Sequence, residues 1–337
     1  MKRIVLYNPS FPGSKATHNE RCFPPYALLQ LAAAARRAGH KPFIVDARIG
    51  QKPPQASEYD YVGVTCMTGT QIRDAVRFCR SVHGPKIWGG WHPTAMPEQT
   101  AQHPEVDLVV SGQGETPLVQ ILDGKLPAQI RGVTYRDPGR GTVSNPPGAP
   151  LPISELPRPL WSAVDMEHYI LQQGGRRIFY YYASQGCPYR CAFCEIGRVT
   201  PKRTTLLPEV VGGEIRDLQD RYSFNTVIFA DNTFTMDEWG KAVARQLSAT
   251  TLSWRMQTRC DQICRLSHEE IDQFKWSGLY WVDMGVESWS DRSLELMNKG
   301  VTTAVAQRAL DLLLDHAIHA GIYLIVGIPG ETAQDIE

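Results

Sequence analysis

The sequence has no excess of charge of either sign and no long apolar run. Its 337 residues include 35 Lys plus Arg and 35 Asp plus Glu, so its charge gives no indication of a nucleic-acid partner or an anionic membrane surface. No apolar stretch approaches the about 20 residues that a membrane-spanning helix needs. Met1–Arg3 lead straight into an apolar strand pattern, so we expect no secretory signal. Eight cysteines in such a chain favour a reducing compartment, and we predict the cytoplasm.

Two nucleotide-binding motifs are also missing. No G-x-G-x-x-G follows the first predicted strand, and no Walker sequence occurs in the chain. These glycine-rich loops hold the phosphates of dinucleotides and nucleoside triphosphates. NAD and nucleoside triphosphates are therefore poor candidates as ligands.

Strand and helix patterns alternate through the first 125 residues, which predicts a parallel sheet covered by helices. The predicted strands are 3–7, 41–46, 61–66, 86–88 and 107–110, and the predicted helices are 25–38 and 71–82. Small and polar residues follow the strands, at 8–9, 65–70, 89–94 and 111–115. Ligands of doubly wound sheets bind at the carboxyl ends of the strands, so these loops together predict a ligand site. Ordinary tight turns are the alternative for any single loop.

A proline-rich stretch separates this half from a second strand and helix pattern. Seven prolines between 138 and 159 predict a stiff linker without regular elements, so we place two domains at 1–135 and 175–337 and a linker at 136–174. The second half has predicted strands near 178–183, 225–230, 253–258, 279–284 and 321–326, and helices near 208–222, 236–248, 267–277 and 302–318. This pattern predicts a partial (β/α) barrel, whose chemistry sits at the carboxyl ends of its strands. Because the sequence ends where a helix has barely begun, we expect a piece of a longer protein.

Three closely spaced cysteines are the most informative feature of the chain. Cys187, Cys191 and Cys194 form a C-x₃-C-x₂-C sequence just after the strand pattern at 178–183. Three thiolates on one short loop can hold an iron–sulfur cluster of four irons and leave one iron open to another ligand. A closed zinc site needs a fourth Cys or His, and no suitable pair stands nearby. A zinc loop and three unrelated cysteines are the alternatives; Cys260 and Cys264 are expected to be core or loop residues.

This cysteine pattern, with Phe193 as its aromatic residue, resembles the signature of radical S-adenosylmethionine (SAM) enzymes. The resemblance implies that Cys187, Cys191 and Cys194 hold a 4Fe–4S cluster whose open iron binds the amino and carboxylate groups of SAM. It also implies contacts to SAM from the ends of the barrel strands. These residues are Phe193, Asp231, Thr233, Arg259, Glu287, Ser288, Gly327 and Ile328. For the acidic residues, a solvated loop or a helix N-terminus is the alternative.

A second resemblance concerns the first half of the chain. Gly89-Gly90-x-His92-Pro93-Thr94 and the later Gly112-x-Gly114-Glu115 look like the cobalamin-binding domain often fused in front of a radical SAM domain. The contacts implied for cobalamin are Thr65, Thr68, Gly89, Gly90, His92, Gly112, Gly114 and Glu115. A cobalamin domain that serves only as a scaffold is the alternative.

The axial ligand of cobalt is a separate question. The D-x-H-x-x-G motif, which supplies a histidine to cobalt in many cobalamin enzymes, is absent, as is common in the fused radical SAM class. We therefore predict that no protein nitrogen binds cobalt, with His92 and His18 as the competing candidates. Pro93 disfavours the helical region for the residue before it, so we expect His92 to be extended.

The predicted fold class is α/β, with an N-terminal doubly wound, Rossmann-like cobalamin-type domain followed by an incomplete (β/α) radical SAM partial barrel. The resemblance implies cleavage of SAM to a 5′-deoxyadenosyl radical, with cobalamin as methyl carrier, for C-methylation of an unactivated carbon. It implies a small-molecule or lipid substrate and an electron donor such as flavodoxin or ferredoxin. An oxidative cyclase or rearrangement enzyme is the nearest alternative, and a non-catalytic cobalamin-binding sensor is the alternative outside enzymes.

Overall fold

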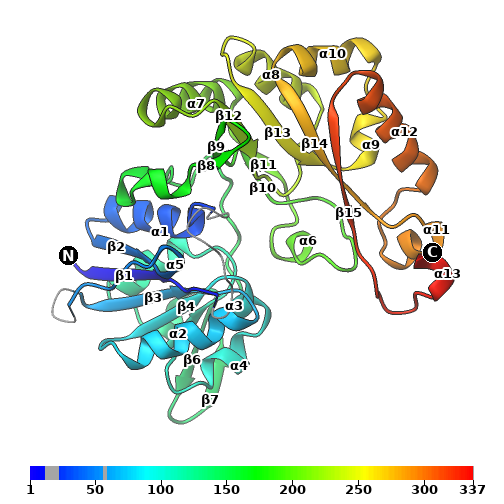
Figure 1. The fold of residues 1–337 in the computed structure, drawn as a ribbon. Coiled ribbons are helices and arrows are strands. Elements are labelled where there is room, and N and C mark those ends of the chain that lie inside the picture. The colour runs from blue at the N-terminus through cyan, green and yellow to red at the C-terminus, as the bar shows by residue number, and fades with distance from the viewer. Residues whose placement is uncertain (12–22, 56–58, 337) are drawn as a thin grey trace. The chain divides into compact units, whose positions relative to one another are not determined.

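The computed structural model describes residues 1–11, 23–55 and 59–336 and divides into two compact units (Figure 1). The first unit comprises Met1–Leu151 with Glu155–Tyr169, and the second comprises Pro152–Ser154 with Ile170–Glu337. Each unit is built on its own β-sheet. Among the described residues, no helix has the length and apolar character needed to cross a membrane.

A seven-stranded sheet forms the first unit, in the order β2-β1-β3-β4-β5-β6-β7. Its strands are β1 (Arg3–Asn8), β2 (Lys41–Asp46), β3 (Tyr61–Thr65), β4 (Lys86–Gly89), β5 (Leu108–Val110), β6 (Val133–Asp137) and β7 (Gly141–Ser144). The strands β1 to β5 pair in parallel, and β6 and β7 are added antiparallel at one edge. The order of the parallel strands is that of a doubly wound sheet, so the predicted fold of this half is confirmed.

Helices cover both faces of this sheet (Figure 1). The helices and 3-10 turns are α1 (Tyr26–Arg37), η1 (Ala47–Ile49), α2 (Thr70–Arg80), α3 (Trp91–Ala95), α4 (Pro97–Ala101), α5 (Glu115–Leu122), η3 (Pro127–Gln129), η4 (Trp161–Ala163) and η5 (Met166–Tyr169). On one face, Leu28 of α1 packs in a cluster with Leu6. On the other face, Phe78 of α2 packs in a cluster with Val5. Neighbouring residues of β1 point to opposite faces, so its unbroken apolar run is buried on both sides.

The prediction that residues 138–159 hold no regular element is wrong. The strand β7 (Gly141–Ser144) pairs with β6 inside the proline-rich stretch. Pro138 and Pro146 flank this strand, and β7 lies at the edge of the sheet, where prolines do not interrupt the ladder of hydrogen bonds. Most of the expected linker also packs with the first unit, as far as Tyr169.

A six-stranded sheet of half-barrel type forms the second unit, in the order β15-β14-β13-β12-β9-β8. Its strands are β8 (Leu171–Gln173), β9 (Arg176–Tyr181), β12 (Thr226–Phe229), β13 (Ser253–Thr258), β14 (Leu279–Glu287) and β15 (His319–Leu324), and β10 (Ser184–Gln185) pairs with β11 (Thr204–Thr205). All except β8 run parallel in the large sheet. This confirms the partial (β/α) barrel.

Helices of the second unit connect successive strands. They are α6 (Ile196–Val199), α7 (Pro208–Tyr222), α8 (Glu238–Leu247), α9 (Cys260–Ile263), α10 (His268–Trp276), α11 (Asp291–Leu296), α12 (Thr303–Asp315) and α13 (Ala333–Ile336). The fully buried Trp254 of β13 packs against Phe229, Phe234 and Phe274, with ring centroids 5.6, 5.7 and 6.2 Å away. Aromatic contacts of this kind hold the strands and helices rigidly, which fixes the loops at the strand ends.

Candidate functional site

The three cysteines lie on the loop that follows β9 and β10, and all three are half-buried. The backbone N–H of Cys187 donates to the carbonyl of Thr200 (3.1 Å), and that of Cys194 donates to the carbonyl of Cys191 (3.1 Å). Gly186 begins the loop with a φ of 84°, and a Cβ there would lie 2.4 Å from a backbone oxygen. Only glycine fits this close approach.

The charges of the cysteines act on one another. Burial raises the pKa of the Cys187 thiol, the neighbouring Cys194 and Cys191 raise it further, and Arg259 lowers it. In the described chain no group of three His, Cys, Asp or Glu side chains, the triad included, stands close enough to hold a single metal ion. The thiolates that hold a four-iron cluster bind different irons, so they stand farther apart than the ligands of one ion. The cysteine loop therefore fits a cluster better than a zinc ion.

A segment after α11 holds the cysteine loop from the barrel side. Met297 accepts a hydrogen bond at its carbonyl from the N–H of Ala192 (2.8 Å). The side-chain amide of Asn298 donates to the carbonyl of Arg190 (2.9 Å). Asn298 has a left-handed φ of 49°, a conformation that asparagine tolerates better than most residues. We did not predict the role of this segment. The sequence Asn-Lys-Gly after a helix indicates a turn, but it does not indicate which part of the chain the turn contacts.

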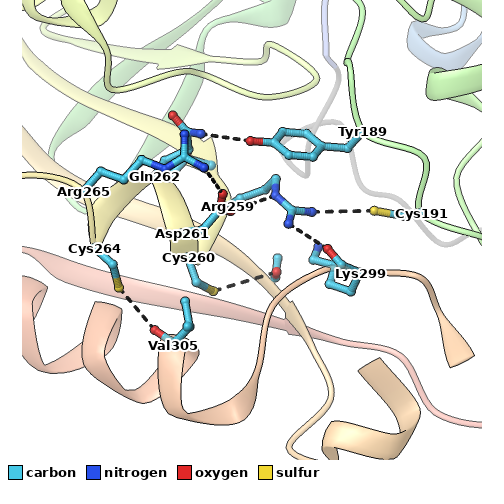
Figure 2. A network of polar contacts seen from close by, with 12 residues as sticks. Tyr189, Cys191, Arg259, Cys260, Asp261, Gln262, Cys264, Arg265, Lys299 and Val305 are labelled. Atoms are coloured by element: carbon cyan, nitrogen blue, oxygen red, sulfur yellow. Dashed lines mark hydrogen bonds and ion pairs between the residues drawn. The ribbon is translucent and has the colours of Figure 1, made fainter. Parts of the chain in front are cut away.

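Arg259 follows β13 and lies against the same loop. Its guanidinium donates to Asp261 Oδ1 (2.8 Å), to the carbonyl of Lys299 (2.7 Å) and to Cys191 Sγ (3.8 Å) (Figure 2). The resemblance implies that Arg259 contacts SAM, which stays a prediction. Within the described chain, its partner at the site is a cysteine of the triad.

Asp231 and Thr233 follow β12, as predicted, and both are buried. Asp231 Oδ1 accepts hydrogen bonds from the N–H groups of Ala183 and Ser184 (2.8 Å each), so it fixes the chain between β9 and the cysteine loop. Burial raises the pKa of Asp231 to about 7, although the Ser184 amide and Arg203 oppose this shift. Asp231 Oδ2 and Thr233 Oγ1 have no hydrogen-bond partner in the described structure. Two such oxygens suit a cationic amino group.

Glu287 and Ser288 lie at the end of β14, which is three residues longer than expected. Glu287 has a φ of 74°, next to a bulge in the pairing with β15; a non-glycine residue in this region is strained by about 1–3 kcal/mol. Its Oε1 accepts from Lys299 Nζ (2.7 Å), and both side chains are buried. Lys299 was not predicted. The Ser288 hydroxyl accepts from the N–H of Ser290 (3.1 Å).

The remaining predicted SAM contacts lie at exposed or partly exposed places. Gly327 and Ile328 follow β15, and their N–H groups donate to Glu331 Oε2 (2.6 and 3.3 Å). The ring of Phe193 is 42% exposed, and Lys299 Nζ lies 5.7 Å from its centroid. These positions do not test the predicted contacts with SAM, which stay predictions.

In the first unit, the loops after β3 and β4 come together. Gly90 has a φ of 97°, and a Cβ there would lie 2.7 Å from Thr65 Oγ1. Thr68 Oγ1 lies 3.3 Å from His92 Nδ1. Met67 and Trp91, on the same loops, are 52% and 43% exposed. Large exposed apolar side chains beside open backbone suit a bulky ligand, and Gly89 ends β4 at this edge.

The expectation that His92 is extended is wrong. His92 lies in the helix α3, one residue before Pro93. A proline in the first turn of a helix is tolerated, because the N–H that it lacks would have no partner within the helix. Here this fit of Pro93 to the first turn outweighs its tendency to keep the preceding residue out of the helical region. Burial lowers the pKa of His92. The other candidate for cobalt, His18, lies outside the described residues.

The predicted loop at 111–115 joins β5 to α5. Gly112, with a φ of 78°, donates its N–H to Thr94 Oγ1 (2.9 Å). Gly114 precedes α5, and Glu115 is the first residue of that helix. The Glu115 carboxyl is buried, burial raises its pKa, and Oε2 has no partner in the described structure. Thr94 thus connects this loop to the loop after β4.

Comparisons with known proteins identify the fold that carries these two sites. The structure is similar to OxsB, a cobalamin-dependent SAM radical enzyme solved with aqua-cobalamin (TM-score 0.81, 18% identity, 100% of this chain and 51% of that one). It is also similar to the radical SAM methyltransferase TsrM from Kitasatospora setae, solved with cobalamin and a 4Fe–4S cluster (TM-score 0.77, 19% identity, 99% and 71%). These likenesses establish the two-domain fold.

Residues 17–122 match the B12 binding domain family, and residues 181–337 match the radical SAM superfamily. The chain therefore combines a B12 binding domain with a domain of the radical SAM superfamily. It is 26% identical to the anaerobic magnesium-protoporphyrin IX monomethyl ester cyclase of Rubrivivax gelatinosus, over 99% of this chain. It is 28% identical to an uncharacterized methyltransferase of Pyrococcus horikoshii, over 93% of this chain. It spans 64% and 72% of the lengths of these two relatives.

Proposed function

We propose that this protein is a cobalamin-dependent radical SAM methyltransferase that methylates an unactivated carbon of a small molecule or lipid. The observation that carries the proposal is the cysteine loop after β9 and β10. Asp231 holds the chain that leads into this loop, and two buried oxygens after β12, Asp231 Oδ2 and Thr233 Oγ1, have no partner in the described structure. A doubly wound domain that matches the B12 binding family precedes this loop in the chain. The methyltransferase relatives support methylation as the outcome.

The described residues supply a place for each cofactor. Cys187, Cys191 and Cys194 would hold the cluster. Asp231 Oδ2 and Thr233 Oγ1 would accept hydrogen bonds from the amino group of SAM. When bound, the reduced cluster and SAM supply a 5′-deoxyadenosyl radical, and cobalamin carries the methyl group.

The protein's own contribution is positioning. Asp231 fixes the chain that leads into the cysteine loop, and the segment after α11 fixes its far side. In the first unit, the exposed side chains of Met67 and Trp91 would contact cobalamin, and Gly90 allows the loops after β3 and β4 to touch. The half-buried thiols suit a reducing compartment such as the cytoplasm, and the electron is expected from a low-potential donor such as flavodoxin or ferredoxin.

The test is a product analysis on anaerobically reconstituted protein with SAM, cobalamin and dithionite or reduced flavodoxin. We expect both 5′-deoxyadenosine and S-adenosylhomocysteine, since methylation consumes SAM as a radical source and as a methyl source. Cys191→Ala should lose the 5′-deoxyadenosine, and Cys264→Ala, outside the triad, should retain it.

An oxidative cyclase is the second candidate, because the Rubrivivax gelatinosus cyclase aligns with 99% of this chain. That activity needs no S-adenosylhomocysteine. Formation of 5′-deoxyadenosine alone would therefore favour the cyclase over the methyltransferase. Cobalamin uptake with neither product would favour a non-catalytic sensor.

A further inference from the structure

Each nitrogen of the Arg259 side chain donates a hydrogen bond to the cysteine loop or to the segments around it (Figure 2). Nε pairs with Asp261 Oδ1 at 2.8 Å, and Nη2 donates to the Lys299 carbonyl at 2.7 Å. The guanidinium carbon lies 3.8 Å above the ring of Tyr189, and Nη1 lies 3.8 Å from Cys191 Sγ. Arg259 is 7% exposed, so water screens its charge little.

The charge of Arg259 is only partly neutralised. Asp261 is the single carboxylate that pairs with it in the described structure, and Asp261 also pairs with Arg265 at 2.8 Å. The remaining positive charge lies toward Tyr189 and Cys191, which both belong to the cysteine loop. Gln262 adds a second anchor, because its side-chain amide donates to the Tyr189 hydroxyl at 2.9 Å.

We propose that Arg259 is a positioning residue that donates a hydrogen bond to the Cys191 thiolate and thereby raises the reduction potential of the cluster. This inference rests on the proposed function, since it assumes that the triad holds a 4Fe–4S cluster. Hydrogen bonds to cysteine sulfur and the net charge nearby are among the factors that set cluster potentials. The reduced state carries one more electron, taken from the external low-potential donor, so a fixed cation beside a ligand sulfur stabilises it.

Lysine does not replace arginine in this role. The planar guanidinium has separate N–H groups for Asp261, the Lys299 carbonyl and Cys191, in one rigid fork. A lysine ammonium keeps the charge but cannot reach these directions at once. The charge and the hydrogen-bond geometry can therefore be separated by experiment.

The test is a redox titration of the reconstituted protein, followed by electron paramagnetic resonance of the reduced cluster, with iron content measured on the same samples. The variants are Arg259→Gln and Arg259→Lys. Arg265→Gln is the matched control, because Arg265 shares Asp261 but makes no contact with a cysteine in the described structure. At a fixed potential, we expect Arg259→Gln to lower the ratio of reduced to oxidised cluster at least tenfold, which is about 59 mV for one electron.

We expect Arg259→Lys to lie between wild type and Arg259→Gln, and Arg265→Gln to match wild type. If Arg259→Gln folds poorly, Arg259→Gln/Asp261→Asn is titrated instead, because it removes both charges of the ion pair together. An unchanged potential at unchanged iron content would overturn the inference. Weaker SAM binding at unchanged potential would also overturn it and would leave Arg259 as a contact to SAM. Absence of a cluster in the wild-type protein would instead be a failure of the proposed function.

Discussion

Replacing Asp231 by Asn should change how the stability of the second unit depends on pH. Asp231 is fully buried, and burial raises its pKa from 3.8 to about 7. The unfolded chain has the ordinary pKa, so between these two values the folded state binds a proton that the unfolded state does not. The free energy of unfolding therefore falls as pH rises through this window and levels off above it.

The expected size follows from the width of the window. Each pH unit is worth about 1.4 kcal/mol for one proton, so three units give roughly 4 kcal/mol as an upper limit. Asn cannot ionise, yet its carbonyl oxygen can still accept from the N–H groups of Ala183 and Ser184, as Oδ1 does. The stability of Asp231→Asn relative to wild type should thus rise by about this amount between pH 4 and pH 7.

The assay is urea unfolding of the apoprotein at several pH values, followed by hydrogen exchange in peptides from residues 170–336, so that the second unit is observed separately. Asp231→Ala is the matched comparison, because it leaves both amides without an acceptor. Relative to Asp231→Asn, which also cannot ionise, it should be destabilised at every pH by about 1–3 kcal/mol for each amide. If the free energies of unfolding of wild type and Asp231→Asn change in parallel between pH 4 and pH 7, Asp231 does not bind a proton on folding and the reasoning is refuted.

Three further outcomes are expected. Gly90→Ala should destabilise the first unit and weaken cobalamin uptake in a spectral titration by more than Gly112→Ala does. Both glycines have a left-handed φ (97° and 78°), but only at Gly90 does the added Cβ have no room. Equal losses would contradict the close loop contact. Lys299→Met should lower the free energy of unfolding by about 3–5 kcal/mol, because it leaves the buried carboxylate of Glu287 without its partner. Adding Glu287→Gln should restore much of this loss. No recovery in the double variant would mean that the lost ion pair is not the cause. Paramagnetic resonance of bound cob(II)alamin should be identical in wild type and His92→Ala, and a nitrogen splitting lost in the variant would disprove an unligated lower face.

Local signals were enough to predict much of this protein. The cysteine spacing places the three proposed cluster ligands on one loop whatever the rest of the chain does. The strands of both units were also predictable, since apolar runs such as that of β1 are local. His92 shows where a local rule fails, because the residue before a proline is usually extended but a helix here begins at Trp91.

The contacts that hold the site were not predictable from the sequence. The two amides bound by Asp231 come from a segment 47 and 48 positions earlier, and they meet it only because β9 pairs with β12. Lys299 reaches Glu287 through a bulge and a left-handed residue. Neither partner has a spacing that periodicity could reveal, since such pairs depend on the register of the sheet.

The hydrogen bond between Asn298 and Arg190 spans 108 positions of the chain, and this has a consequence for biosynthesis. A ribosome adds about 5–20 residues per second, so the cysteines leave it roughly 5–20 s before the segment that holds their loop. During this interval the segment that holds the cysteine loop is not yet synthesised, so the thiols are open to oxidation and to binding of the wrong metal. Productive cluster delivery should therefore follow completion of the chain as far as residue 299, and a cell that loads this enzyme efficiently must keep its nascent thiols reduced until then.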